Sequence, residues 1–234
     1  MEERPGLGWA STARRVALHP MTILIDSEFG RFPGNGVAAA ELVNLALPGA
    51  MMSAEILAEA TMKALTGFFD SSPMLAEELE EFLTLRTSNE RILRWNIMKI
   101  APNASFRLHA HQNIELICVL EGAMNEVRMI SDPPQRVFSA DQKDGPSLTD
   151  PNLGLRFERR TTYAPTKLLS ACTVDDLQPS FLINPKGSIH LSYTSEEGAN
   201  LLVLWSGTHG NIPAHEYPPD SESVFALPDS IVPF

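Results

Sequence analysis

The first half of the chain carries apolar residues at helical spacing. Residues 37–47 are nearly all strong helix formers, and a Pro-Gly pair ends this run. Ser53 can cap a second run with helical periodicity, and Pro73 takes the first helical position of a third run that begins at Ser72. The pattern predicts a helical segment over residues 37–87.

Outside this segment, apolar residues come in short runs between turn residues, as in a β-protein. Residues 1–36 predict an irregular arm with one edge strand at residues 22–25. The run from Arg91 to Ile100 predicts a strand, and a return strand at residues 124–130 predicts a hairpin after Gly122. Residues 131–151 are too rich in turns for regular structure. Further short strands are predicted at residues 153–159, 167–172, 180–183, 191–193 and 199–205, the last two joined by a turn at residues 195–198.

Candidate chemistry lies between Phe106 and Gly122. Side chains alternate between the two faces of a strand, so Arg107, His109 and His111 are expected on one face, and Glu115 returns to it. Two imidazoles and a carboxylate suit a borderline divalent ion such as iron, manganese, nickel or zinc. A buried guanidinium on the same face needs a partner, either a substrate carboxylate or a carboxylate of the barrel.

A later stretch supplies a further nitrogen ligand. Pro185 and Gly187 form a Pro-x-Gly turn, and His190 follows at the start of another apolar strand. A His-x-His pair alone is more often a surface pair than a metal site. The additional glutamate, glycine and distant histidine favour the metal site.

Together these residues resemble the two motifs of the cupin superfamily, G-x5-H-x-H-x3-E-x6-G and G-x5-P-x-G-x2-H-x3-N. Asn103 replaces the leading glycine of the first motif, and asparagine tolerates a left-handed turn. Pro179 and Thr194 replace the leading glycine and the final asparagine of the second motif. The matching positions are His109, His111, Glu115 and Gly122 in the first motif, and Pro185, Gly187 and His190 in the second.

The resemblance implies an all-β fold, the cupin double-stranded β-helix or jelly-roll barrel, here with an α-helical N-terminal extension. Only one pair of motifs is present, so a single barrel is expected. The expected organisation is an irregular arm over residues 1–36, a helical extension over 37–87 that packs on the barrel, a cupin barrel over 88–210 and a C-terminal tail over 211–234.

The resemblance also implies one divalent transition metal per chain, held by His109, His111, Glu115 and His190, and a small-molecule substrate inside the barrel. An iron(II) dioxygenase is the favoured hypothesis, with manganese, nickel and zinc as other candidate ions. Glu115 and Arg107 are expected to take part in catalysis. Thiol dioxygenases generally use three histidines without a carboxylate, which disfavours that subgroup. The alternatives are a lyase or isomerase that uses the ion as a Lewis acid, and a non-catalytic small-molecule-binding cupin.

Composition narrows the partners. A formal net charge of −11 at pH 7 argues against nucleic acid, which is held by clustered Lys and Arg. The chain lacks an apolar run of membrane length, so no membrane partner is expected. Two cysteines make no disulfide framework, and a secretory segment is not evident, which favours a cytoplasmic location. The arginines near the N-terminus leave an organellar address open.

One strand is apolar on both faces. Leu116, Cys118 and Leu120 have the parity opposite to that of the candidate ligands. Such a strand is covered on both sides, here by the helices, by a second sheet edge or by a partner subunit. This surface predicts a homodimer. Cys118 is expected to be a buried thiol of the core rather than a nucleophile.

Overall fold

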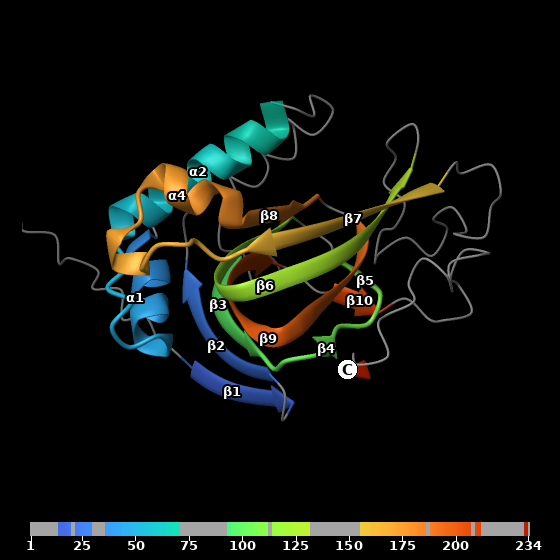
Figure 1. Cartoon of the computed structure of the whole chain (residues 1–234), viewed down its shortest axis with the longest axis horizontal. Coiled ribbons are helices and arrows are strands. Elements are labelled where there is room, and N and C mark those ends of the chain that lie inside the picture. The colour runs from blue at the N-terminus through green and yellow to red at the C-terminus, as the bar shows by residue number, and fades with distance from the viewer. Residues whose placement is uncertain are drawn as a thin grey trace, which may run out of the picture.

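The computed structural model is a strongly curved β-sheet with helices along one side (Figure 1). It describes residues 14–19, 22–29, 36–70, 93–111, 114–131, 155–185, 188–206, 209–211 and 232–233. The helix predicted from Ser72, the turn-rich stretch after Ser131 and most of the tail lie outside the described residues. The described elements are β1 (Arg14–His19), β2 (Thr22–Phe29), α1 (Gly36–Ala46), α2 (Ala54–Asp70), β3 (Leu93–Ile100), β4 (Ala104–Ser105), β5 (His109–His111), β6 (Glu115–Ser131), β7 (Leu155–Tyr163), η3 (Leu169–Ala171), α4 (Val174–Leu177), η4 (Gln178–Ser180), β8 (Phe181–Asn184), β9 (Ile189–Ser206), β10 (His209–Asn211) and β11 (Val232–Pro233).

Two long strands, β6 and β9, organise the sheet. They run antiparallel to each other from Leu116 opposite Leu204 to Met129 opposite Ile189. The first half of β6 also pairs with β8, and its second half pairs with β7. The second half of β9 pairs with β3, and its first half pairs with β4 and β5. Each long strand therefore pairs with different strands along its two halves, within one largely antiparallel sheet.

Glycines bend both long strands at the same place. Gly122 has φ +73° and Gly198 has φ +70°, in the left-handed region that suits glycine. A Cβ on Gly122 would collide with the carbonyl oxygen of Gly198, so the two bends lie against each other. The hairpin predicted after Gly122 is wrong, because the glycine bends β6 without reversing it. The predicted pair of strands joined at residues 195–198 is likewise one strand, β9.

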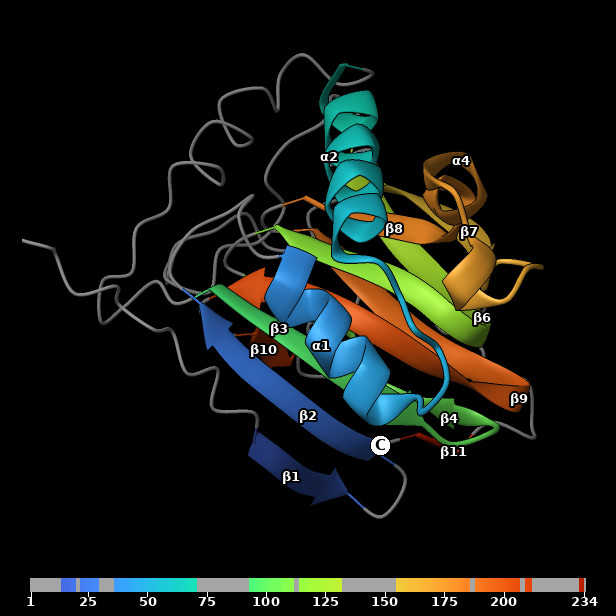
Figure 2. The ribbon, with the colours of Figure 1, turned by 90° about the vertical axis from the view of Figure 1, so that its left-hand side faces the viewer.

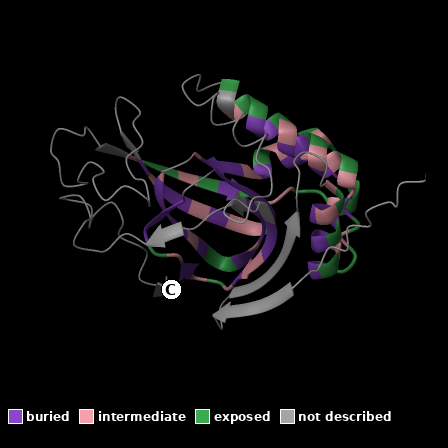
Figure 3. Cartoon of the chain, turned by 180° about the vertical axis from the view of Figure 1, so that it is seen from behind, coloured by how far each residue is buried: buried purple, intermediate pink, exposed green. Residues whose placement is uncertain are grey.

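A helical layer covers one face of this sheet (Figure 2). Leu116, Cys118 and Leu120 belong to the same buried cluster as Leu42 of α1 and Leu57 of α2. The sequence left open whether the helices, a second sheet edge or a partner subunit cover this face of β6. In the structure the helices cover it. Burial follows the contact, since the helix residues that face the sheet are the buried ones (Figure 3).

Local interactions define the two helices. The predicted run at residues 37–47 corresponds to α1, and Ser53 accepts a hydrogen bond from the backbone of Ile56 at the start of α2 (3.4 Å). Between the helices, the backbone N–H of Met52 donates to the side-chain oxygen of Asn44 (2.8 Å). Within the described part of the chain, no helix has the length and apolar character needed to cross a membrane.

The inner face of the sheet encloses a second buried cluster. It includes Ile117, Val119 and Met124 of β6 together with Leu201 and Val203 of β9. The antiparallel strands with two helices before the barrel confirm the predicted fold class, an all-β jelly roll with an α-helical N-terminal extension.

Two residues that replace the usual residues of the cupin motifs, Asn103 and Thr194, are accommodated in the structure. Asn103 has φ +55°, the left-handed conformation expected where the motif has glycine. Thr194 replaces the final asparagine of the second motif, and its hydroxyl donates to the carbonyl of Ala101 (2.7 Å) and accepts from the backbone N–H of Ala104 (3.2 Å). Thr194 therefore fastens the turn that leads into the first motif.

Two predictions of local structure fail. The arm contains two strands instead of one, because β1 pairs with β2 and β2 pairs along its full length with β3. The strand predicted at residues 167–172 is instead a 3-10 turn that leads into α4. Thr173 caps α4 by exchanging hydrogen bonds with Asp176, so capping overrides the weak strand pattern there.

Candidate metal centre

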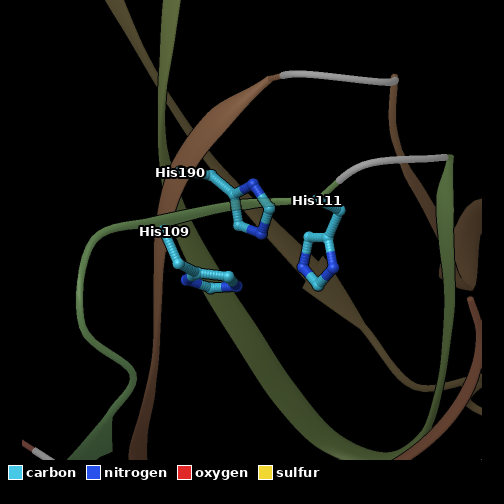
Figure 4. A group of neighbouring side chains, drawn as sticks. All are labelled: His109, His111 and His190. Atoms are coloured by element: carbon cyan, nitrogen blue, oxygen red, sulfur yellow. The ribbon is translucent and has the colours of Figure 1, made fainter. Parts of the chain in front are cut away.

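Three histidines from two strands meet inside the barrel (Figure 4). His109 and His111 lie two apart on β5, so their side chains share a face. His190 near the start of β9 stands opposite His109 in the strand register. One potential ligand atom from each ring lies within 4.8 Å of the others. All three residues are buried, with at most 8% of their surface exposed.

A backbone hydrogen bond fixes the tautomer of His109. Its Nδ1 lies 2.7 Å from the carbonyl oxygen of Arg107. A carbonyl only accepts hydrogen bonds, so Nδ1 carries the proton and Nε2 keeps a free lone pair. Burial lowers the pKa of His109 well below its usual value, and the neighbouring imidazoles of His190 and His111 lower it further. His109 is therefore neutral and able to bind a metal ion.

Glu115 contacts the other two imidazoles. One carboxylate oxygen, Oε1, lies 3.4 Å from Nε2 of His111, and the other, Oε2, lies 3.2 Å from Nε2 of His190. Burial acts to raise the pKa of Glu115, but His111, His190 and His109 outweigh it and hold the pKa below its usual value. Burial acts to lower the pKa of His190, and Glu115 with Glu126 raises it instead. Glu115 is thus a buried carboxylate at the edge of the histidine group.

A hydrogen-bond network extends from Glu115 away from the histidines. The amide nitrogen of Asn184 donates to Oε2 of Glu115 (3.0 Å) and to Oε1 of Glu126 (2.8 Å). Arg160 donates through Nε to Oε2 of Glu126 (2.7 Å) and through Nη2 to Oδ1 of Asn184 (2.7 Å). The Glu126 and Asn184 residues are each 1% exposed. The network therefore adds a second buried carboxylate, that of Glu126, and the partly exposed guanidinium of Arg160 to the described site.

The donor set fits a divalent transition metal. Nitrogen ligands from imidazoles with one carboxylate suit iron, manganese, nickel or zinc better than the all-oxygen sites of calcium or magnesium. Nδ1 of His190 has no hydrogen-bond partner among the described residues, although it is buried. A buried polar cluster of this kind is costly unless a bound group satisfies it. His109, His111 and His190 would hold the ion, with Glu115 placed beside two of them.

Arg107 lies elsewhere than the strand alternation predicted. Its residue is exposed, because β5 begins only at His109 and the alternation of strand faces does not extend back to Arg107. Its backbone carbonyl lies 2.7 Å from Nδ1 of His109. A part for Arg107 in catalysis stays a prediction. Gly187 of the second motif lies outside the described residues, and Pro185 follows directly after the last residue of β8.

Sequence reasoning missed Glu126, Asn184 and Arg160. The inner face of β6 carries odd-numbered residues up to Val119, but register shifts on either side of Gly122 move even-numbered residues inward afterwards. Glu126 therefore joins the site from a position that simple alternation assigns to the other face. The sequence does show charged residues within apolar strands, but it does not indicate which residues these charges contact.

Comparisons with known proteins give a weak likeness in structure alone. No model of a known protein family matches the chain, and no curated protein matches it. Among solved structures, a variant of oxalate decarboxylase from Bacillus subtilis aligns at 12% identity with TM-score 0.36, over 87% of this chain and 30% of that chain. Another variant of that enzyme aligns at 17% identity with TM-score 0.31, over 50% and 22%. A DMSP lyase from Ruegeria pomeroyi aligns at 13% identity with TM-score 0.31, over 53% and 44%. The chain thus spans less than half of the length of each of these three proteins.

Proposed function

We propose that this protein is a metal-dependent enzyme of the cupin type, and that it acts as an iron(II) dioxygenase on a small organic substrate. The observation that carries the proposal is the group of His109, His111 and His190, buried together with Glu115 against two of the rings. Four protein ligands complete a structural site around a four-coordinate ion. An ion that takes five or six ligands keeps one or two positions open when it is held by three histidines and one carboxylate, and a substrate can bind there.

The residues of the site have separate tasks in this proposal. His109 stays neutral because of burial and presents Nε2, since Nδ1 is used by the carbonyl of Arg107. Glu115 stays ionised and would offset part of the charge of the ion. It is also a carboxylate beside the histidines that could accept a proton from a substrate. When bound, iron(II) would supply the redox chemistry that combines O2 with an organic molecule.

The position of the cysteines also bears on the proposal. Cys118 and Cys172 belong to the cluster under the helices, on the face of the sheet opposite to the site. No described cysteine therefore stands among the candidate ligands. A thiol substrate is disfavoured for a separate reason, since the additional carboxylate departs from the three-histidine sites of thiol dioxygenases.

A lyase or isomerase is the second candidate. The observation that favours it is the ionised Glu115 beside the histidines, because a metal acting as Lewis acid needs a base close to the polarised substrate. In that reaction the carboxylate would remove a proton and O2 would play no part.

The test begins with metal content. We expect elemental analysis of the purified protein to find about one divalent transition metal per chain. His109→Ala should lose this metal, and Asn125→Ala, which removes an amide on the surface of β6, should keep it. Turnover of small carboxylic acids and diketones is then compared with and without O2. Consumption of O2 supports the dioxygenase, and equal anaerobic turnover supports the lyase. A protein that refuses iron, manganese, nickel and zinc on reconstitution would end the catalytic proposal.

A further inference from the structure

Asn184, Glu126 and Arg160 form a closed ring of hydrogen bonds behind Glu115. Arg160 donates to both of the others, and Asn184 donates to Glu126, so each member contacts the remaining two. The register explains the meeting, since Glu126 stands opposite Arg160 on β7 and Glu115 stands opposite Asn184 on β8. The two carboxylates lie on either side of the bend in β6, and Asn184 connects them.

The ring fixes the orientation of the Asn184 amide. Its nitrogen has two hydrogens, and these go to Glu115 (3.0 Å) and Glu126 (2.8 Å). Its oxygen accepts from Arg160 (2.7 Å). A rotation of the amide by half a turn would direct the oxygen at two carboxylates and the nitrogen at a guanidinium. That arrangement replaces three attractive contacts with repulsive ones, so the amide has one stable orientation.

We propose that Asn184 is a positioning residue that holds the carboxylate of Glu115 in one orientation for metal binding, and that Arg160 and Glu126 hold Asn184. This inference rests on the proposed function, because it assumes that Glu115 faces a bound ion. Asn184 donates to Oε2 of Glu115, the oxygen that lies 3.2 Å from Nε2 of His190, whereas Oε1 lies 3.4 Å from Nε2 of His111. The hydrogen bond therefore fixes which carboxylate oxygen faces which histidine.

The same ring sets the charge near the site. Glu126 is buried and is paired with Arg160, whose side chain is 24% exposed. The positive guanidinium compensates Glu126, so Glu115 is the carboxylate left to balance the ion. Buried ion pairs add little net stability compared with well-packed apolar side chains. Support of a metal ligand gives a reason for placing this polar ring beside the histidines.

The test compares cobalt(II) binding by four full-length proteins. These are the wild type, Asn184→Ala, Arg160→Lys and the control Asn125→Ala. Cobalt is used because its visible spectrum changes with the ligands. Asn125 is a matched control, since it also joins strands through its side-chain amide, donating to Ser195 (3.0 Å), but it contacts no candidate ligand among the described residues. Arg160→Lys keeps the charge while it removes the planar fork that donates to Glu126 and Asn184 together.

We expect Asn184→Ala to weaken cobalt binding about 10- to 100-fold and to shift the visible spectrum of the bound ion. Arg160→Lys should shift the spectrum in the same direction, and it decides the question alone if Asn184→Ala does not fold. Asn125→Ala should match the wild type. A variant pair with lowered thermal stability but wild-type spectrum and affinity would show that the ring is only structural and would overturn the inference. That result leaves the proposed function standing, whereas a wild type that binds no cobalt overturns both.

Discussion

Replacing Gly122 by alanine should destabilise the protein more than the same replacement at a glycine that has a left-handed backbone but open space around it. The left-handed φ of +73° costs an L-residue about 1–2 kcal/mol. The added Cβ would also collide with the carbonyl of Gly198, so β6 and β9 must separate at the bend. A shift of the backbone at Gly122 would also weaken the hydrogen bond from the N–H of Ala164 to the carbonyl of Gly122 (3.1 Å). Such a bond contributes about 1 kcal/mol to the free energy of unfolding. The free energy of unfolding should fall by about 2–3 kcal/mol in total.

Two other glycines serve as controls that separate the cost of the left-handed backbone from the cost of the steric collision. Gly49 has φ +92° but open space around it, so Gly49→Ala should cost about 1–2 kcal/mol. Gly67 in α2 has open space and no left-handed φ, so Gly67→Ala should stabilise by about 0.5–1 kcal/mol. Urea unfolding of all variants in the presence of a chelator gives the values without the contribution of bound metal. A Gly122→Ala cost no larger than that of Gly49→Ala would refute the close approach of the two bends.

Further predictions concern the site, the thiols and the assembly. Glu115→Gln should lower activity by more than metal occupancy, because an amide neither offsets the charge of the ion nor accepts a proton; both are measured on one preparation, and full activity with an unaltered metal spectrum would refute the ligand role. Burial raises the pKa of both Cys118 and Cys172, so neither should react with Ellman's reagent at pH 8 until urea is added, and rapid labelling of the native protein would contradict this. Light scattering should give the mass of a dimer; because the helices already bury Leu116, Cys118 and Leu120 within one chain, the contact would lie elsewhere on the surface, and a monomer at high concentration would refute the prediction.

The histidine group could be predicted because its geometry is local. His109 and His111 share a face in any extended strand, whatever the rest of the chain does. The distance to His190 along the chain carries no geometry, and only the spacing of the second motif pointed to it. The structure then places His190 opposite His109 by strand pairing. Helices α1 and α2 were likewise predictable, since their periodicity and the cap at Ser53 lie within single segments.

The features that could not be predicted depend on pairing between strands that are distant in sequence. The sequence of β6 reads as two strands because Gly122 interrupts it, yet both halves pair with β9 and form one bent strand. Whether a glycine reverses a chain or bends it is decided by the neighbouring strand, which is remote in sequence. The same bend shifts the alternation and brings Glu126 to the interior. For Arg107 strand alternation does not determine the face, because this exposed residue precedes the first residue of β5, and its part in catalysis stays a prediction.

The first half of β6 joins the helical layer to the candidate metal centre. Glu115 begins the strand on its inner side, while Leu116 and Cys118 are packed under the helices on its outer side. Because successive side chains of a strand point to opposite faces, packing under the helices fixes the backbone that carries Glu115. A cavity made under the helices, as in Leu57→Ala, should therefore disturb Glu115 more than the histidines of β5, which no described helix residue backs in the same cluster. The position of the carboxylate thus depends on the N-terminal extension as well as on the barrel.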